Sequence, residues 1–128
     1  MLEIAHHSPS SGILQKDIAR NQNISNKYLD HIIHALKAAE LIVNVKGKKS
    51  GYILTREPSE ISVYDIHNAF EPGICVIDCL SRSIKCDREE GCVAKGFWGG
   101  LNKRMVDYFN SFSLEDLLQN ETILDDVI

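Results

Sequence analysis

The feature that most constrains the fold is an apolar stripe at helical spacing, which follows a strong helix-capping residue. Ser25 is a favourable N-cap, and Ile24 before it is placed to pack on Leu29 as a hydrophobic staple. The apolar positions that follow recur every three or four residues: Leu29, Ile32, Ile33, Leu36 and Ala39. This pattern predicts an amphipathic helix that begins after Ser25 and buries one face.

The segments on either side of this helix complete a recognisable order. Residues 13–22 (ILQKDIARNQ) predict a shorter helix, and residues 41–46 and 52–54 predict two strands. The connection between the strands has a glycine at each end and carries Lys48 and Lys49. Short helix, turn, longer helix and basic β-hairpin is the order of a winged helix-turn-helix, whose second helix enters the major groove of DNA. We therefore expect a mainly α fold with a small β-hairpin, and a DNA-binding domain in residues 1–60.

The second half of the chain predicts three more helices and a dimer. One helix lies within residues 59–71 behind the cap candidate Ser62, and a short last helix begins at Ser113. Between them, an apolar stripe marks a helix of about four turns: Phe97, Leu101, Met105, Phe109 and Phe112. Such a stripe is usually core, but a helix at the end of a small domain has little core to join. A second copy of the chain is its natural partner, and a two-fold dimer matches a palindromic operator. We expect residues 61–128 to form a cysteine-loop and dimerisation region.

Charge is unevenly distributed along the chain. The net charge is −4, yet residues 1–60 carry eight Lys/Arg against six Asp/Glu, and residues 61–128 carry six against twelve. An acidic protein can still present a basic face to DNA. The hairpin lysines are suited to phosphates, and Asp30 to a cytosine amino group, although a solvated turn and a plain surface carboxylate are the ordinary alternatives. The candidate DNA contacts are Ser25, Lys27, Tyr28, Asp30, Lys46, Lys48 and Lys49.

The composition of the chain indicates its class of protein and its cellular location. The 128 residues are 44% hydrophobic and 25% charged, which is ordinary for a globular chain. Apolar runs stay far below the roughly 18 residues of a membrane span, and the start lacks signal-peptide features, so we expect a cytoplasmic protein without a membrane partner. Nucleophile–base, phosphate-loop and HExxH motifs are missing from the sequence, so we do not expect an enzyme.

All four cysteines fall within residues 75–92, at the spacing Cys75-x3-Cys79-x6-Cys86-x5-Cys92. Clustered thiols in a reducing compartment favour metal or redox chemistry over disulfides, and burial is disfavoured in so charged a stretch. Structural zinc sites usually show pairs spaced by two to four residues, which only Cys75 and Cys79 provide. Soft thiolates also suit iron–sulfur clusters. The spacing alone leaves zinc and a cluster equally open.

Four segments together resemble one bacterial family. DIARNQNISNKYLDHIIHALKAAELIVNVKGKKSGYIL, then ISVYDIHNAFEP, then three loop cysteines, then FSLEDL resemble the Rrf-type (BadM) transcription regulators. The resemblance covers essentially the whole chain in order. Its most specific parts are the IS-x-x-YL helix start and the three-cysteine loop.

The resemblance implies a homodimer of winged-helix domains joined through the long C-terminal helix. It implies that Cys79, Cys86 and Cys92 hold an iron–sulfur cluster, either [2Fe-2S] or [4Fe-4S], that Asp30 reads bases and that Lys46 is the basic residue of the wing. The implied function is a transcription regulator that senses redox state, nitric oxide or iron–sulfur status. The alternatives are a cluster-free regulator with thiol, zinc or partner-protein input, and a metalloprotein that does not bind DNA.

Two departures from the family pattern bear on this expectation. Family members usually begin with a further stretch before LEIA, so we expect a shortened first helix here. The iron–sulfur assembly regulators have a histidine three residues after the last cysteine, where this chain has Lys95. Cys75 is an additional cysteine, and it is the candidate fourth ligand.

Overall fold

The computed structural model describes residues 1–46 and 51–119. Lys48 and Lys49, two of the expected DNA contacts, lie outside these ranges. The elements in chain order are α1 (Leu2–His6), α2 (Gln15–Asn21), α3 (Asn26–Ala38), β1 (Ile42–Asn44), β2 (Tyr52–Leu54), η1 (Pro58–Glu60), α4 (Val63–Asn68), η2 (Asp78–Leu80), α5 (Val93–Ser111) and α6 (Leu114–Gln119).

The capped helix forms where the sequence predicts it. The Ser25 hydroxyl accepts a hydrogen bond from the Tyr28 amide at 3.1 Å, which satisfies one of the free N–H groups at the start of α3. Leu29, Ile33 and Leu36 are buried, as the stripe predicts. Ala39 is the exposed C-cap, so the buried stripe ends one turn earlier than expected.

The hairpin is shorter than predicted but has a third segment beside it. β1 and β2 pair antiparallel, with Val43 opposite Ile53. On the other edge of β2, Ile13 and Tyr52 exchange two backbone hydrogen bonds of 3.2 and 2.8 Å. A Cβ at Gly51 would lie 2.7 Å from the carbonyl carbon of Gly12, so this close approach requires glycine. The residues before α2 are thereby fixed to the hairpin.

One core joins the N-terminal elements to the last helix. Its buried members are Ile4, Ala5, Ile13, Ile18, Ala19, Leu29, Ile33, Leu36, Leu41, Ile42, Leu54, Ile61 and Leu114. Ile61 and Leu114 are both fully buried, and the Leu114 amide donates to the Ile61 carbonyl at 2.7 Å. The Val63 amide donates to the Phe112 carbonyl at 2.9 Å. The chain therefore leaves the N-terminal domain after residue 61 and returns to it at α6.

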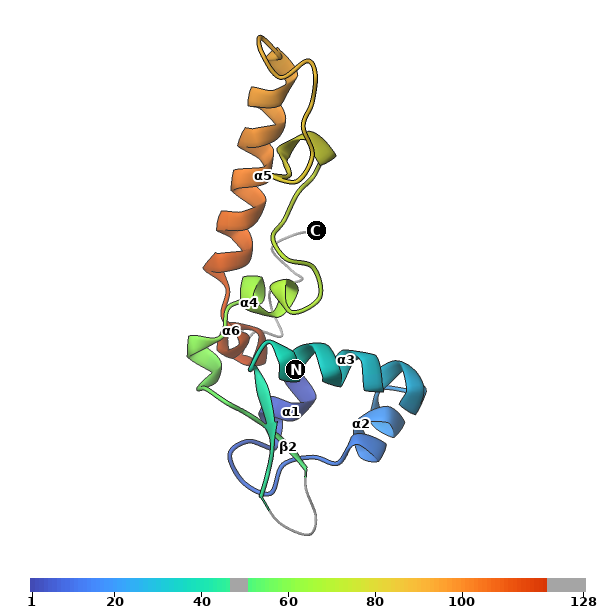
Figure 1. The fold of residues 1–128 in the computed structure, drawn as a ribbon. Coiled ribbons are helices and arrows are strands. Elements are labelled where there is room, and N and C mark those ends of the chain that lie inside the picture. The colour runs from blue at the N-terminus through green and yellow to red at the C-terminus, as the bar shows by residue number, and fades with distance from the viewer. Residues whose placement is uncertain (47–50, 120–128) are drawn as a thin grey trace.

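Helix α5 extends away from this core, with the cysteine loop folded back along it (Figure 1). It packs on α4 near its C-terminal end and on η2 further along. Within the residues that the structure describes, no side chain of α5 is fully buried, although several are half-buried. It begins at Val93, four residues before the predicted stripe, so the glycines near its start do not prevent the helix. In the two described ranges, no helix combines the length and apolarity needed to cross a membrane.

Truncating Leu114 tests whether α6 is part of the N-terminal core. Leu114→Ala removes a fully buried side chain and should lower the free energy of unfolding by about 2–5 kcal/mol in urea denaturation. The same change at Leu2, which is 43% exposed, is the matched control and should cost clearly less. Equal losses in the two variants would contradict the described packing of α6.

Candidate nucleic-acid interface and cysteine loop

The first two turns of α3 present their polar side chains to solvent. Ser25, Lys27, Tyr28 and Asp30 are all exposed, while Leu29 between them is buried beneath the helix. Tyr28 keeps 60% of its surface exposed, which is unusual for a large aromatic residue and leaves its ring available to a partner. The structure therefore gathers the four predicted contacts of this helix at one exposed end.

Asp30 is held by a residue that sequence reasoning missed. The Gln15 side-chain amide, at the first position of α2, donates to Asp30 Oδ1. The Tyr52 hydroxyl of β2 donates in turn to Gln15 Oε1 at 3.3 Å. These residues are 15 and 37 positions apart in sequence, so no local pattern signals their contact. Only the folded arrangement of α2, α3 and β2 brings them together.

The hairpin is braced against the end of α3 by Lys37. Its ammonium donates to Asn44 Oδ1 on β1 at 2.9 Å and lies 5.9 Å from the centre of the Tyr52 ring. This geometry combines a hydrogen bond with a cation–π contact. Lys46 follows β1 and is exposed, as an interface residue must be. Lys37 therefore stabilises the position of the wing, and Lys46 is the described hairpin lysine that is available to a partner.

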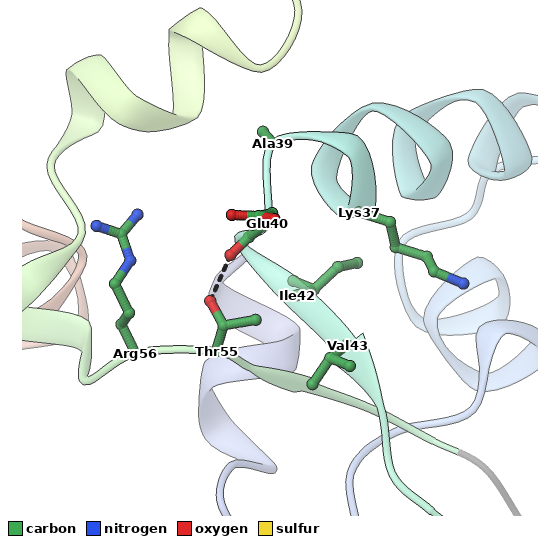
Figure 2. Close-up of a pocket in the computed structure, with 7 residues that line it drawn as sticks. All are labelled: Lys37, Ala39, Glu40, Ile42, Val43, Thr55 and Arg56. Carbon is green, nitrogen blue, oxygen red and sulfur yellow. Dashed lines mark hydrogen bonds between the residues drawn. The ribbon is translucent and has the colours of Figure 1, made fainter.

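Beside this brace lies an open groove of about 710 Å³, drawn in Figure 2. It is lined by Lys37, Ala39, Glu40, Ile42, Val43, Thr55 and Arg56. The Thr55 hydroxyl donates to the Glu40 carbonyl at 2.5 Å across it, and the charged ends of Lys37 and Arg56 point away from each other (Figure 2). Polar groups do not converge on one point here, so the groove lacks the arrangement that a catalytic site requires.

The cysteine loop is an irregular segment with one short 3-10 turn, η2, which contains Cys79. Cys75 and Cys92 are exposed, and Cys79 and Cys86 are half-buried. All four lie in the described part of the chain and are free thiols. The Cys75 thiol donates to the Ile77 carbonyl at 3.0 Å. The loop therefore keeps every thiol available for binding or oxidation.

The thiols fit a cluster in chemistry but are not gathered for one. Thiolates are the usual ligands of iron–sulfur clusters and of structural zinc. Within the described residues, however, no three His, Cys, Asp or Glu side chains come together as a metal-binding group. Binding a cluster would therefore require the loop to rearrange, which its exposure and irregular backbone permit.

Lys95 lies at the entrance to α5, close to two of these thiols. It forms an ion pair with Glu89, and the hydrogen bond that the Lys95 ammonium donates to this carboxylate raises the pKa of Lys95. Negative charge on Cys79 and Cys86 would raise this pKa further. The position that the resemblance assigns to a histidine ligand is therefore occupied by a cation, which ligates no metal in its charged form.

Two contacts connect the loop to α5. The Val76 amide donates to Asn102 Oδ1 at 2.9 Å, and Asn102 lies near the middle of the helix. Leu80 of η2 lies over Gly99, where an added Cβ would be 4.0 Å from its Cδ2 atom. The segment that carries Cys75 and Cys79 is therefore fixed to α5, and a change in the loop would act directly on that helix.

The predicted dimerisation stripe divides into two parts. Phe97 and Leu101 are exposed, at 69% and 38%, whereas Met105, Phe109 and Phe112 are half-buried. Phe109 packs edge-on against His67 of α4, with ring centres 5.5 Å apart. Within one chain, α4 covers part of the C-terminal end of the stripe and leaves the outer end uncovered.

The sequence matches a described protein family over nearly its full length. Residues 1–120 match the family described as Rrf2, iron-dependent transcriptional regulator. The chain is 31% identical, over 98% of its length and 76% of the relative, to the HTH-type transcriptional regulator IscR of Photorhabdus laumondii. It is 32% identical, over 96% of its length and 82% of the relative, to protein rrf2 of Nitratidesulfovibrio vulgaris.

Solved structures show the same architecture. CymR (YrzC), titled the global cysteine regulator of B. subtilis, matches 92% of this chain and 86% of its own, with a TM-score of 0.76 and 25% identity. T. potens IscR matches 92% of this chain and 77% of its own, with a TM-score of 0.71 and 32% identity. The described fold is therefore that of winged-helix regulators.

Proposed function

The chain belongs to the Rrf2 family of transcriptional regulators, and we propose that it is a dimeric DNA-binding regulator whose operator affinity depends on an iron–sulfur cluster held by its cysteine loop. The matched family and the relative IscR are described as transcriptional regulators, and this chain is a regulator rather than an enzyme. The observation that supports DNA binding is the exposed, capped start of α3, which is connected to the hairpin by the hydrogen bonds from Tyr52 to Gln15 and from Gln15 to Asp30. A DNA partner would place the protein in the cytoplasm.

In the proposed complex, the start of α3 enters the major groove and the wing follows the backbone. Asp30 accepts from a cytosine amino group, and Lys27, Tyr28 and Ser25 contact neighbouring bases or phosphates. Lys46 neutralises a phosphate, together with Lys48 and Lys49 of the hairpin connection. The exposure of the described side chains supports these roles.

We further propose that two chains pair through α5. A helix of 19 residues that fully buries none of its side chains in its own chain leaves apolar surface in water. Phe97 and Leu101 supply this surface, and Met105, Phe109 and Phe112 continue it towards α4. A two-fold axis beside α5 would present two recognition helices to a palindromic operator.

The sensing element in this proposal is the loop of residues 75–92. Cys79, Cys86 and Cys92 would hold the cluster, with Cys75 as the fourth ligand. A bound cluster makes the loop responsive to iron and sulfide supply, to oxidants and to nitric oxide. Because Val76 is hydrogen-bonded to Asn102, ordering of the loop would act on α5 and through it on the spacing of the recognition helices. This requires different operator affinities for the two states of the loop.

A cluster-free regulator is the second candidate. Two observations favour it: Cys75 and Cys92 are exposed, so an oxidant can reach them, and a similar solved structure is titled a cysteine regulator. In that case, oxidation of the exposed thiols, zinc or a partner protein would supply the signal.

Removing the wing charge tests the DNA interface. Lys46→Ala should weaken operator binding and lower the magnitude of the log Kd against log salt slope by about one unit for each wing, because one phosphate contact is lost. Fluorescence anisotropy over a salt series measures both quantities. Lys103→Ala is the matched control, since Lys103 is paired with Asp107 on α5 at 2.6 Å and should leave the slope unchanged. An unaltered slope for Lys46→Ala would argue against this contact.

Placing a charge on the outer stripe tests the dimer. The wild type should sediment as a dimer, and Leu101→Lys should dissociate it, because the charge would be buried between two helices. Analytical ultracentrifugation measures the mass, and Val43→Lys at the 45% exposed hairpin position is the control. A monomeric wild type, or a variant that stays dimeric, would exclude pairing through this face.

Iron and sulfide content tests the sensing loop. After anaerobic reconstitution, the wild type should show broad visible absorption with matched iron and sulfide, and Cys79→Ala should lose both. Cys75→Ala separates a ligand from a bystander, because only a ligand variant would lose or alter the spectrum. A colourless, iron-free wild type would rule out the cluster, and zinc content would then distinguish the cluster-free inputs.

A further inference from the structure

We infer that Gln15 is a positioning residue for base reading, which fixes the carboxylate of Asp30 so that one oxygen is directed at the DNA. The inference rests on the proposed function, because it assumes that Asp30 meets a base edge. It concerns a residue on α2, outside the recognition helix, that has no role in the sequence-based interpretation.

An exposed aspartate on a helix does not hold one orientation by itself. Its carboxylate can accept several hydrogen bonds, and at a DNA surface the phosphates repel it. The donor from Gln15 Nε2 engages Oδ1 and leaves acceptor capacity on Oδ2. Reading a cytosine needs one acceptor at the amino group, so an anchored Oδ1 and an available Oδ2 suit this task.

The orientation of Gln15 is itself determined by the hairpin. Tyr52 Oη donates to Gln15 Oε1 at 3.3 Å, which favours the amide orientation that presents Nε2 to Asp30. Tyr52 is fixed on its backbone by Ile13, two residues before Gln15, and Lys37 lies over its ring. The side-chain series Tyr52, Gln15, Asp30 thus joins the wing, α2 and α3 at the interface.

This arrangement orders the reading group before DNA arrives. Fixing a side chain in its bound orientation lowers the entropy lost on binding and penalises base pairs that do not match it. Gln15 is therefore expected to determine selectivity at one base pair in each half-site, with a smaller effect on total affinity.

The test is operator selection from a randomised duplex library by the full-length chain, followed by Kd measurements at each position. Asp30→Ala first identifies the base pair that Asp30 reads, where the wild type should discriminate by about tenfold or more. Gln15→Glu keeps the side-chain shape, removes the donor and repels Asp30. It should reduce discrimination at that same base pair to about twofold or less and leave the other positions unchanged.

Two further variants make the result specific. Gln22→Ala is the matched control, because Gln22 is the C-cap of the same helix and donates to Glu3 at 3.2 Å, away from Asp30. The Gln22→Ala variant should select the wild-type operator. Tyr52→Phe leaves α2 and α3 unaltered but removes the hydroxyl that orients Gln15. It should partially reduce discrimination at the base pair that Asp30 reads. It also provides the answer if Gln15→Glu does not fold.

The outcomes separate the inference from the function on which it rests. Wild-type selectivity in both Gln15→Glu and Tyr52→Phe, with Asp30→Ala relaxed, would overturn the positioning role and leave base reading intact. If Asp30→Ala selects the wild-type operator, Asp30 reads no base, and both the base contact and its positioning are excluded. If Gln15→Glu alone lost base discrimination at every position of the operator, Gln15 would have a general structural role, and this result would also overturn the inference.

Discussion

The structure depends on the contact between residues 61–63, where the chain leaves the N-terminal core, and residues 112–114, where it returns to that core. Ile61 and Leu114 are fully buried there, and two backbone hydrogen bonds join the segments. The segment from α4 through the cysteine loop to α5 lies between these two points. Both of its ends are therefore fixed to the N-terminal core. A displacement of α5 would therefore reach the helix-turn-helix through well-packed residues rather than through a loose linker. Continuously packed side chains of this kind can carry coupling between distant sites.

The segment from the cysteine loop to α5 leaves much of its surface exposed in a single chain, and this exposure is informative about function. Helix α5 and the cysteine loop contain all four thiols and several of the exposed apolar side chains, among them Val93, Phe97 and Leu101, whereas the buried core lies in the N-terminal elements and α6. Surface that one chain does not bury is available to a second chain, and an irregular loop is available to a bound group. The contacts of Asn102 and Gly99 connect these two features. Dimerisation and sensing would then be properties of one element.

Local patterns predicted the elements well, and tertiary contacts much less. The Ser25 cap, the stripe of α3 and the hairpin follow from spacing and capping, which act within a few residues. The return of α6 to the core does not, because a short helix with one buried leucine has no distinctive period. The same holds for Gln15, whose partners Asp30 and Tyr52 are distant in sequence. The cysteine spacing suggested a common ligand set, but spacing along the chain does not determine where the thiols lie, and no three of them form a metal-binding group in the described residues.

The measurement that tests the account most directly is operator affinity of one anaerobic preparation, divided into a form reconstituted with iron and sulfide and a form stripped by a chelator. Anisotropy titrations at the same salt concentration would give both Kd values. The account predicts that they differ by about tenfold or more, which corresponds to a coupling free energy of about 1.4 kcal/mol. Equal Kd values for a reconstituted form that demonstrably contains iron and sulfide would contradict it.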